Sequence, residues 1–403
     1  MASGSAANRG WPALEYETLP WEARNAAASR TAQRRHRGPY QAAIVPAIAD
    51  AELRLPSSIT AAAEDAATAI ARFDAEIGHE IAPFTAVLLR SESAASSKIE
   101  NLTASARAIA EAELGGSPGR NARLVVANVR AMNAAVDLAD HIDADAILEM
   151  HRALLAEMNP AIAGKWRSEQ VWIGGSDYGP HGAMFVPPHH RHVEAAIADL
   201  IAFIDRDDIP VLTHAAVAHA HFETIHPFPD GNGRTGRALV HAQLRNKGLT
   251  RNVTVPVSAG LLTNTDTYFD ALTAYRDGDP VPIIERVAEA SFAALDNGRA
   301  LVEDLRHVRA AWQERIRVRR GASAWRAVDL VVRHPVVNAK LVAAELGVAP
   351  PNAYRAIAPL VDAGVLVEFS DKKRNQLWQA PDVLEALDAF ATRAGRRGQS
   401  RPT

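Results

Sequence analysis

The sequence contains no cysteine among its 403 residues. A disulfide framework, a thiol nucleophile and a cysteine-ligated zinc site are therefore excluded. Aromatic residues make up only 6% of the chain, and no apolar run approaches the roughly 20 residues that cross a bilayer. The first twenty residues lack the basic-then-apolar order of a secretory signal peptide. We therefore expect a cytoplasmic protein with no membrane partner.

Neither sign of charge dominates, since 44 Lys+Arg stand against 47 Asp+Glu, and 48% of the residues are hydrophobic. A uniformly basic nucleic-acid coat and wholesale disorder are excluded. The charge is unevenly distributed: residues 1–38 and 321–403 each carry +3, and residues 39–320 carry −9. Because an acidic body repels polyanions, an anion site within it needs a local concentration of positive charge.

Much of the chain has the composition and apolar spacing of helices. The sequence GGSPG at 115–119 is a clear break. The length predicts two or three domains. Helices are predicted over residues 59–78, 80–90, 100–114, 121–141, 145–157, 191–205, 211–225, 233–247 and 281–318.

Two segments depart from this helical pattern. Residues 170–188 contain two short β-rich pieces, Val171–Ile173 and Met184–Val186, separated by Gly, Ser, Asp and Pro, which predicts a β-hairpin. Residues 341–380 predict a helix, a turn at Gly347, a second helix and a hairpin. That order is typical of a helix-turn-helix followed by a wing.

Residues 226–237, HPFPDGNGRTGR, combine the groups that phosphate chemistry needs. His226 has an ordinary pKa of about 6.5 and is suited to act as a base near neutral pH. Asp230 is a hard carboxylate of the kind that Mg²⁺ prefers. A Gly-Asn turn then precedes a helix, whose first amides bind anions. Arg234 and Arg237, one turn apart, add guanidinium groups that suit phosphate oxygens. The segment predicts phosphoryl or nucleotidyl transfer.

Two other interpretations remain open. Gly and Asn also shape ordinary turns between helices, in which the arginines are only solvated. Alternatively, His219, Glu223 and His226 would share one helix face in a metal–carboxylate enzyme, with Glu223 and His226 at the spacing of a bundle ligand pair. A second such pair, Glu76–His79, is interrupted by Gly78, and no matching bridging carboxylates are evident.

The segment HPFPDGNGRTGR resembles the signature of the Fic family, His-Pro-Phe-x-Asp-Gly-Asn-Gly-Arg-x-x-Arg, at every fixed position. The similarity extends over most of residues 40–290. Members are mostly helical and typically transfer AMP from ATP to a hydroxyl side chain of a target protein. The resemblance therefore implies a protein adenylyltransferase that uses ATP and Mg²⁺ (or Mn²⁺).

The resemblance also implies a role for each motif residue. His226 would deprotonate the target hydroxyl, and Asp230 would hold the Mg²⁺. The remaining positions would bind the nucleotide: Gly231, Asn232 and Gly233 cradle phosphates, Arg234 stabilises the leaving pyrophosphate, Arg237 grips the γ-phosphate, and Tyr268 lies at the base. Gly231 follows the Asp as in nucleotidyl-transferring members, whereas the Doc-type kinases differ there. A core tyrosine is the alternative for Tyr268.

The hairpin at 170–188 resembles the family's target-docking flap. An exposed edge strand would let an extended target segment, from another protein or from this chain, add by main-chain hydrogen bonds. We expect Met184 and Phe185 to lie over that target or over the adenine. The alternative is that both residues pack on the core.

Residues 96–101, SSKIEN, are by themselves typical of an N-terminal helix cap or a solvated helix face. Beside a Fic core they resemble the family's inhibitory motif, Ser/Thr-x-x-x-Glu-Gly/Asn, with Ser96, Glu100 and Asn101 at its fixed positions. The implied role is that Glu100 pairs with Arg237 and inhibits productive ATP binding. The same glutamate could instead position water for removing AMP from a modified target.

The C-terminal segment also fits a binding module. In a winged helix the second helix would enter the DNA major groove and the wing would touch phosphate. The candidate DNA contacts are Asn352, Tyr354 and Arg355 on the helix and Lys372, Lys373 and Arg374 at the wing tip. Winged helices also dock proteins or join two copies of a chain, so a DNA-binding regulator, a protein-docking module and a homodimer all remain open.

The predicted fold is mainly α, a Fic-type helical core with a β-hairpin flap, an N-terminal helical region and a C-terminal winged helix-turn-helix domain. The predicted domains are a basic arm that is poorly ordered or extended (1–38), a helical region with the inhibitory motif (39–115), the catalytic core (116–300), a helical connector (301–320) and the winged helix (321–403).

Overall fold

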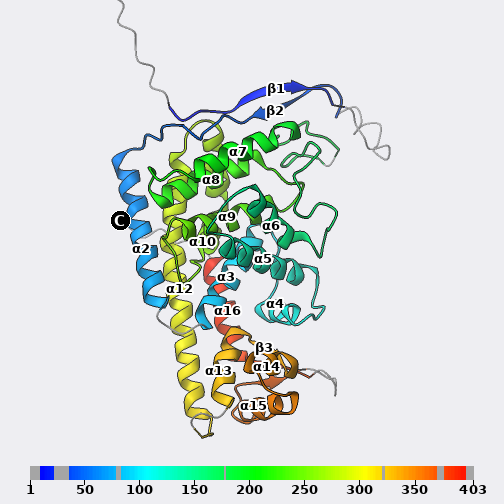
Figure 1. Cartoon of the computed structure of the whole chain (residues 1–403), viewed down its shortest axis with the longest axis vertical. Coiled ribbons are helices and arrows are strands. Elements are labelled where there is room, and N and C mark those ends of the chain that lie inside the picture. The colour runs from blue at the N-terminus through cyan, green and yellow to red at the C-terminus, as the bar shows by residue number, and fades with distance from the viewer. Residues whose placement is uncertain are drawn as a thin grey trace, which may run out of the picture. The chain divides into compact units, whose positions relative to one another are not determined.

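The computed structural model describes residues 10–21, 36–78, 83–176, 178–319, 323–369 and 376–395. These residues are mainly helical, as the sequence predicts, with small antiparallel sheets (Figure 1). They group into two compact units, which interleave along the chain. The first unit comprises residues 1–65, 134–247 and 266–288, and the second comprises residues 66–133, 248–265 and 289–403.

The first unit holds a two-stranded sheet and a set of helices. In the sheet, β1 runs antiparallel to β2 with Glu15 opposite Ile44 and Leu19 opposite Tyr40. For the N-terminal arm the sequence predicted a poorly ordered or extended chain and no particular strand, whereas β1 is a paired strand within it. The elements are β1 (Glu15–Leu19), β2 (Tyr40–Ile44), α6 (Ala144–Leu155), η1 (His190–His192), α7 (Val193–Ile204), α8 (Val211–Ile225), α9 (Asn232–Asn246) and α11 (Thr265–Arg276).

The centre of the first unit is the pair formed by α8 and α9. Nearly every residue of α8 is buried, because alanines at alternate positions let neighbouring helices approach and its histidines find partners inside the unit. α7 packs on α8, and α6 packs on α9. The carboxyl end of α8 and the amino end of α9 are thereby fixed, so the short loop that joins them lies on a rigid support.

The second unit contains a helical part and the C-terminal segment. Its elements are α3 (Pro83–Ile99), α4 (Ala106–Glu113), α10 (Val257–Leu261), η2 (Leu262–Asn264), α13 (Ser323–Arg333), β3 (Val336–Asn338), α14 (Ala339–Leu346), α15 (Pro350–Asp362), β4 (Val367–Glu368), β5 (Leu377–Gln379) and α16 (Pro381–Ala394). Three long helices have residues in both units: α2 (Ser57–Gly78), α5 (Arg120–Asp137) and α12 (Val281–Arg315).

Helix α3 corrects one predicted boundary. The sequence predicted separate helices over 80–90 and 100–114, whereas α3 continues through the serine-rich stretch to Ile99. Serine competes with the backbone for hydrogen bonds and usually favours helix ends. Here the hydroxyls of Ser93 and Ser97 donate to the carbonyls of Leu89 and Ser93, both at 2.9 Å, so the buried serines stay helical.

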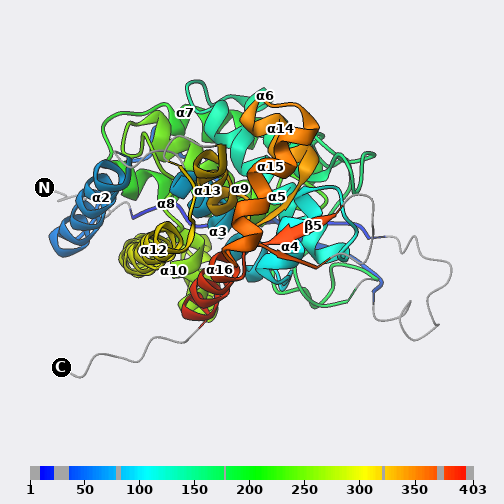
Figure 2. The same ribbon diagram turned by 90° about the horizontal axis from the view of Figure 1, so that it is seen from below.

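The C-terminal segment has the element order predicted from the sequence. α14 ends at Gly347, whose φ of 63° is in the left-handed region, and α15 begins three residues later. The strands form a sheet in the order β3-β5-β4, with Val367 opposite Gln379. Figure 2 shows α14, α15 and β5 of this segment. Lys372, Lys373 and Arg374 at the predicted wing tip lie outside the described residues. The helix–turn–helix and the hairpin are present, and assignment as a winged helix remains a prediction.

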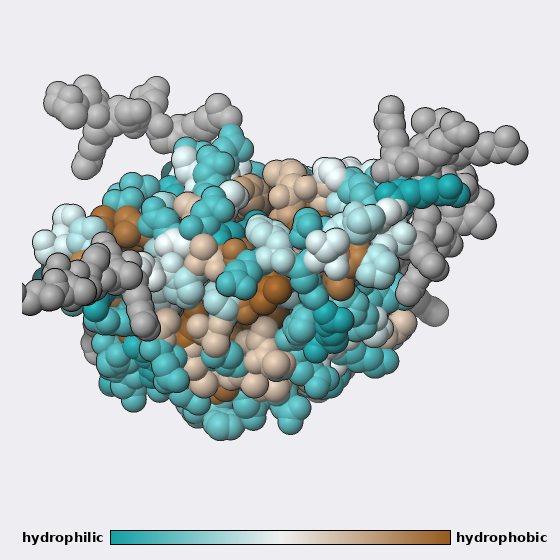
Figure 3. All heavy atoms as spheres, turned by 90° about the horizontal axis from the view of Figure 1, so that it is seen from above, coloured by the Kyte–Doolittle hydropathy of each residue, from teal (hydrophilic) through white to brown (hydrophobic). Residues whose placement is uncertain are grey.

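Among the described helices, none combines the length and the apolar character needed to cross a membrane. The side of the molecule that carries β1 and β2 in Figure 1 is shown in Figure 3, where hydrophobic surface is interrupted by hydrophilic residues. Exposed large hydrophobic side chains in the first unit include Tyr16, Ile44, Tyr178 and Met184.

Candidate active site

The loop between α8 and α9 carries most of the residues predicted for catalysis. α8 ends at Ile225, and His226 follows as its C-cap with φ 49° and ψ 60°. A left-handed backbone is unusual for a residue other than glycine and is favoured here because Pro227 cannot continue the helix. The amide of His226 still bonds the Phe222 carbonyl at 2.9 Å. The chain therefore turns sharply at His226.

The imidazole of His226 is mostly buried and has an unused nitrogen. Its Nδ1 lies 4.0 Å from Glu223 Oε2, and this buried atom has no hydrogen-bond partner among the described residues. Burial, together with the positive charges of Arg167 and Arg276, lowers the pKa of His226 to about 3. The ring is therefore neutral at neutral pH, which is the form that accepts a proton.

Arg167, whose role was not predicted from the sequence, holds this loop through hydrogen bonds to its backbone. Its guanidinium donates to the carbonyls of His226 at 2.9 Å, Glu169 at 3.1 Å and Pro188, and its amide donates to the Pro227 carbonyl at 3.0 Å. Desolvation lowers the pKa of Arg167 to about 10, so it remains charged. One buried side chain thus fixes both the histidine turn and the end of the 170–188 hairpin.

Asn232 closes the loop with its side chain. Its Oδ1 accepts the Phe228 amide and its Nδ2 donates to the Phe228 carbonyl, each at 2.8 Å. Both polar atoms of the side chain are therefore engaged with the chain itself. Of the polar groups of Asn232, the backbone N–H at the start of α9 is therefore the one left for the predicted phosphate site.

Beneath the loop, His151 forms a second support that the sequence did not reveal. Its ring stacks on Phe228 with centroids 3.7 Å apart. Nδ1 accepts the Gly164 amide at 3.0 Å, so the proton is on Nε2, which donates to the Asp230 carbonyl at 3.0 Å. Burial lowers the pKa of His151 to about 4 and preserves this neutral tautomer.

Gly231 is the N-cap of α9 and has φ 79°. A Cβ at this position would lie 2.8 Å from Leu154 Cδ2, so both backbone conformation and space require glycine. The motif's glycine therefore lets the loop close onto α6 and places the first amides of α9 at the mouth of the site. These amides and the helix dipole lie where the sequence predicted an anion site, and anion binding there remains a prediction.

Two arginines and one aspartate surround this helix start. Arg234 and Arg237 are both buried in α9, and Arg234 Nη2 lies 3.4 Å from Asp230 Oδ1. The Asp230 carboxylate is 63% exposed, and its Oδ1 accepts the Gly231 amide at 2.6 Å. A single exposed carboxylate beside an anion site fits Mg²⁺, which proteins usually hold with one or two carboxylates together with substrate phosphates.

Tyr268 and the histidines of α8 belong to the core. Tyr268 is buried, and its hydroxyl lies 2.7 Å from His219 Nε2. It therefore has the position of a core tyrosine, the alternative to a contact with the nucleotide base. His221 contacts the Tyr275 hydroxyl at 2.9 Å, and His214 contacts the Phe203 carbonyl at 2.7 Å. No group of three or more His, Asp or Glu side chains in the described part of the chain has the arrangement of a metal site. The metal–carboxylate interpretation therefore gains no support.

The predicted hairpin at 170–188 is reduced to bridges. Ile173 pairs antiparallel with Phe185, with the Ile173 amide donating to the Phe185 carbonyl at 2.8 Å. Met184 is 84% exposed, whereas Phe185 is buried under the Arg276 guanidinium, which lies 3.8 Å from the ring centroid. On the other side of the second hairpin arm, β2 donates the Ala43 amide to the Val186 carbonyl at 3.0 Å. Part of the flap edge is therefore already covered by this chain.

The predicted inhibitory residues lie at the end of α3, in the second unit. Ser96 is buried in the last turns, Glu100 is half-buried and Asn101 is exposed with φ 61°. The pattern is thus at a helix C-terminus, which corrects the alternative of an N-terminal cap. The proposed pairing of Glu100 with Arg237 remains a prediction.

The candidate DNA contacts of the C-terminal segment share one helix. Asn352, Tyr354 and Arg355 are exposed on α15, and Arg355 Nη1 lies 3.4 Å from Asn352 Oδ1. Their exposure is consistent with a binding surface and does not distinguish DNA from protein.

Comparison with known proteins places the site in a family. Residues 141–244 match the Fic/DOC family. The chain carries a Fic/DOC family domain. It is 31% identical over 159 residues to protein adenylyltransferase fic-1 of Caenorhabditis elegans and 32% identical over 164 residues to protein adenylyltransferase Fic of Nematostella vectensis. These matches cover 39% and 40% of this chain but only 28% and 35% of the two relatives.

A solved structure supports the fold of this chain. The crystal structure of a Fic family protein from Desulfovibrio desulfuricans G20 has a TM-score of 0.53 at 20% identity, covering 81% of this chain and 97% of that chain. The mainly helical, Fic-type fold predicted from the sequence is confirmed, and residues 141–244 match the predicted family. Arg167, His151 and Phe228 were missed because their roles depend on backbone carbonyls and stacking, which leave no distinctive spacing in the sequence.

Proposed function

We propose that this Fic protein transfers AMP from ATP to a hydroxyl side chain of a protein. The observation that carries the proposal is the neutral, mostly buried His226 with an unpartnered Nδ1, positioned beside the amino end of α9 with its two arginines. Matches to protein adenylyltransferases over about two fifths of the chain support the same activity.

In the proposed reaction the target oxygen attacks the α-phosphorus of ATP. A new oxygen–phosphorus bond forms, the bond from that phosphorus to the oxygen bridging to the β-phosphate breaks, and pyrophosphate leaves. The hydroxyl proton passes to the neutral imidazole of His226. Because its imidazole is neutral before the reaction and Arg167 fixes its backbone, His226 accepts the proton without prior rearrangement.

The triphosphate is proposed to lie over the amino end of α9. The first amides of the helix would bind phosphate oxygens, Arg234 would neutralise charge on the leaving pyrophosphate and Arg237 would hold the γ-phosphate. Asp230 would hold Mg²⁺, which neutralises phosphate charge when bound. Because Tyr268 is buried, its predicted contact with the base requires an opening beside α11.

The target is proposed to dock at the 170–188 hairpin. Since β2 already bonds Val186 in the second arm, an added strand would use the first arm, Val171–Ile173. The exposed Met184 is placed to contact the target, whereas the buried Phe185 supports the hairpin from within. Self-modification would use the same edge.

Glu100 is proposed to inhibit the transfer by pairing with Arg237 and removing it from the γ-phosphate. The placement of this motif at a helix end supports a change of position with little cost, since helix termini open more readily than helix interiors. The same carboxylate could instead position water for AMP removal, and this activity is the alternative to be measured beside transfer.

The function is tested with His226→Ala. We expect loss of labelled AMP incorporation from ATP by at least about 100-fold, in the range of general base catalysis, while ATP binding measured by calorimetry stays within about twofold. His141→Ala, which replaces an exposed histidine of the same unit, is the matched control and should transfer normally. Retained transfer by His226→Ala would exclude this residue as the base.

The inhibitory role is tested with Glu100→Gly. Incubation with each labelled nucleoside triphosphate and Mg²⁺, followed by mass spectrometry, should show increased modification of this chain or a target, with ATP as the preferred donor. Glu111→Gly, an exchange of a glutamate on α4, controls for the added glycine. Equal incorporation by the wild type and Glu100→Gly would remove Glu100 as an inhibitor.

A separate binding role is proposed for the C-terminal segment, on the observation that Asn352, Tyr354 and Arg355 are exposed together on α15. A salt-dependent shift of duplex DNA by the full chain, lost in Arg355→Glu, would identify DNA as the partner. Absence of any shift would favour protein docking.

A further inference from the structure

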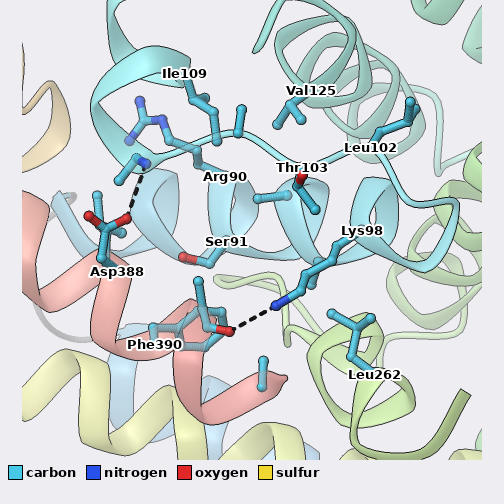
Figure 4. Close-up of a pocket in the computed structure, with 17 residues that line it drawn as sticks. Arg90, Ser91, Lys98, Leu102, Thr103, Ile109, Val125, Leu262, Asp388 and Phe390 are labelled. Atoms are coloured by element: carbon cyan, nitrogen blue, oxygen red, sulfur yellow. Dashed lines mark hydrogen bonds between the residues drawn. The ribbon is translucent and has the colours of Figure 1, made fainter. Parts of the chain in front are cut away.

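The second unit contains a cavity of about 140 Å³ beside the end of α3. It is bounded by α3, the loop that follows it, α4 and α16, and its side chains are shown in Figure 4. The cavity is separate from the residues 226–237 of the first unit. Its volume is close to that of cavities known to accept a benzene ring.

The walls of this cavity are mainly apolar and combine alanines with larger aliphatic side chains and Phe390. Ala94 and Ala95 of α3 face Ala391 and Ala394 of α16 across it. Interiors are normally packed without such voids, because unfilled space forfeits dispersion contacts. A flat, ring-sized apolar group would restore those contacts.

One polar group in the wall lacks a partner. Ser91 is 4% exposed, and its Oγ has no hydrogen-bond partner among the described residues. Leaving a buried hydroxyl unsatisfied is unfavourable, because the group has lost its hydrogen bonds to water. A hydrogen-bonding group on a ligand at this end of the cavity would remove that cost.

A cation lies at the other end. Lys98 is two helical turns after Ser91 on α3, about 10 Å along the axis, and both residues line the cavity. Lys98 Nζ donates to the Ala391 carbonyl at 3.3 Å, the longer end of the hydrogen-bond range. A carboxylate would be a stronger acceptor for this ammonium than a neutral carbonyl.

The other charged groups of the lining are already engaged. Arg90 binds Glu113 with two nitrogens, at 2.8 and 2.9 Å, and donates to the Arg333 carbonyl at 2.8 Å. Asp388 Oδ1 accepts the Ala106 amide at 3.2 Å. Lys98 is therefore the charged side chain of the lining that is best placed to exchange its present partner for a ligand.

We propose that this cavity binds a small aromatic carboxylate that carries a hydroxyl group on the far side of its ring. The carboxylate pairs with Lys98, the ring lies between the alanines of α3 and α16, and the hydroxyl bonds Ser91 Oγ.

A ligand there would contact the segment that ends α3. Leu102 and Thr103 line the cavity, and the Leu102 amide bonds the Ser97 carbonyl at 3.0 Å, while the Asn101 amide bonds the Lys98 carbonyl at 2.9 Å. An occupied cavity therefore stabilises the turn that includes Glu100. Any resulting change in AMP transfer rests on the proposed function, whereas the binding itself does not.

The test uses 4-hydroxybenzoate with the full chain, measured by calorimetry and thermal unfolding. We expect saturable binding that is at least tenfold tighter than that of 4-hydroxybenzamide, its neutral analogue. Lys98→Met, an exchange at a partly exposed site, should remove this preference. Ser91→Ala should abolish the advantage of 4-hydroxybenzoate over benzoate.

The cavity itself is tested with Ala391→Leu, whose larger side chain fills it. This variant should bind 4-hydroxybenzoate at least tenfold more weakly than the wild type. Ala62→Leu, on the exposed face of α2, is the matched control and should bind as the wild type does. Amide hydrogen exchange at residues 100–102 should slow with ligand in the wild type but not in Ala391→Leu, and this readout is independent of transfer activity. Absence of binding at millimolar ligand, or binding unchanged in both Lys98→Met and Ala391→Leu, would overturn the proposal.

Discussion

At the scale of single residues, the chemistry depends on side chains that act on the backbone. Arg167 donates to carbonyls on both sides of the His226 turn and at the end of the flap. Asn232 and His151 hold the loop in the same way, through Phe228 and the Asp230 carbonyl. The proposed base, His226, is thus held in place by polar side chains whose hydrogen bonds are made to the protein backbone.

Arg167→Gln should therefore reduce AMP transfer by at least about tenfold while ATP binding changes little, since a displaced catalytic group costs rate more than affinity. Arg167 is also one of the charges that lower the pKa of His226. Its loss raises that pKa, so the acid side of the pH–rate profile moves to higher pH.

The matched control is Arg54→Gln, which alters an exposed arginine paired with Glu52 in the same unit. A pH–rate profile of Arg167→Gln that coincides with that of the wild type would show that Arg167 serves only packing.

At the scale of elements, the end of α3 gives a physical reason for the last position of the inhibitory motif. The bonds from Leu102 to Ser97 and from Asn101 to Lys98 form a Schellman turn, in which Asn101 occupies the left-handed position. Glycine and asparagine are the residues that tolerate this conformation best. The motif's Gly/Asn preference is thus explained by helix termination, separately from any role in inhibition.

Asn101→Gly should leave the free energy of unfolding unchanged or raise it by up to about 1 kcal/mol, whereas Asn101→Ala should lower it by about 1 kcal/mol. Urea unfolding measures both variants, and exchange of the Leu102 amide shows whether the turn has opened. Equal stability of the two variants would mean that the left-handed conformation at this position costs alanine nothing.

At the scale of the whole molecule, the first unit buries several histidines in the neutral form. Burial lowers the pKa of His219, His221 and His226 to about 3 and that of His151 to about 4. In the unfolded chain each would titrate at about 6.5. Between these values the unfolded state binds more protons than the folded state. The stability that these histidines contribute is therefore fully present above about pH 6.5 and is lost as the pH falls toward their folded-state pKa values.

We therefore expect the free energy of unfolding to fall steeply from pH 7 to pH 5. Each buried histidine contributes up to about 1.4 kcal/mol per pH unit, so the four together give an upper limit of about 5 kcal/mol per unit. Urea unfolding at a series of pH values measures this slope. His221→Leu should make this slope shallower, whereas His141→Gln, at an exposed histidine, should leave it unchanged. An unchanged slope in His221→Leu would mean that His221 titrates normally in the folded protein.

The sequence by itself determined the mainly helical fold and located the loop 226–237, for which it predicted phosphate chemistry, because helix spacing and a dense motif of polar residues are local properties of the chain. It also indicated the helix–turn–helix and hairpin near the C-terminus. Its helix boundary near 90 was wrong, since serine favours a helix end unless burial lets its hydroxyl bond a carbonyl one turn back, as in α3.

Only the tertiary structure decided which side chains support the site and which fill the core. Sequence spacing could not separate the proposed base, His226, from the structural histidines of α8, because the distinction depends on Tyr268 and Tyr275, which are about fifty residues away from those histidines. It could not show that β2 covers part of the flap edge or that α16 leaves a cavity beside α3. Those features arise from contacts between distant segments, and a sequence pattern records only the residues that lie near one another along the chain.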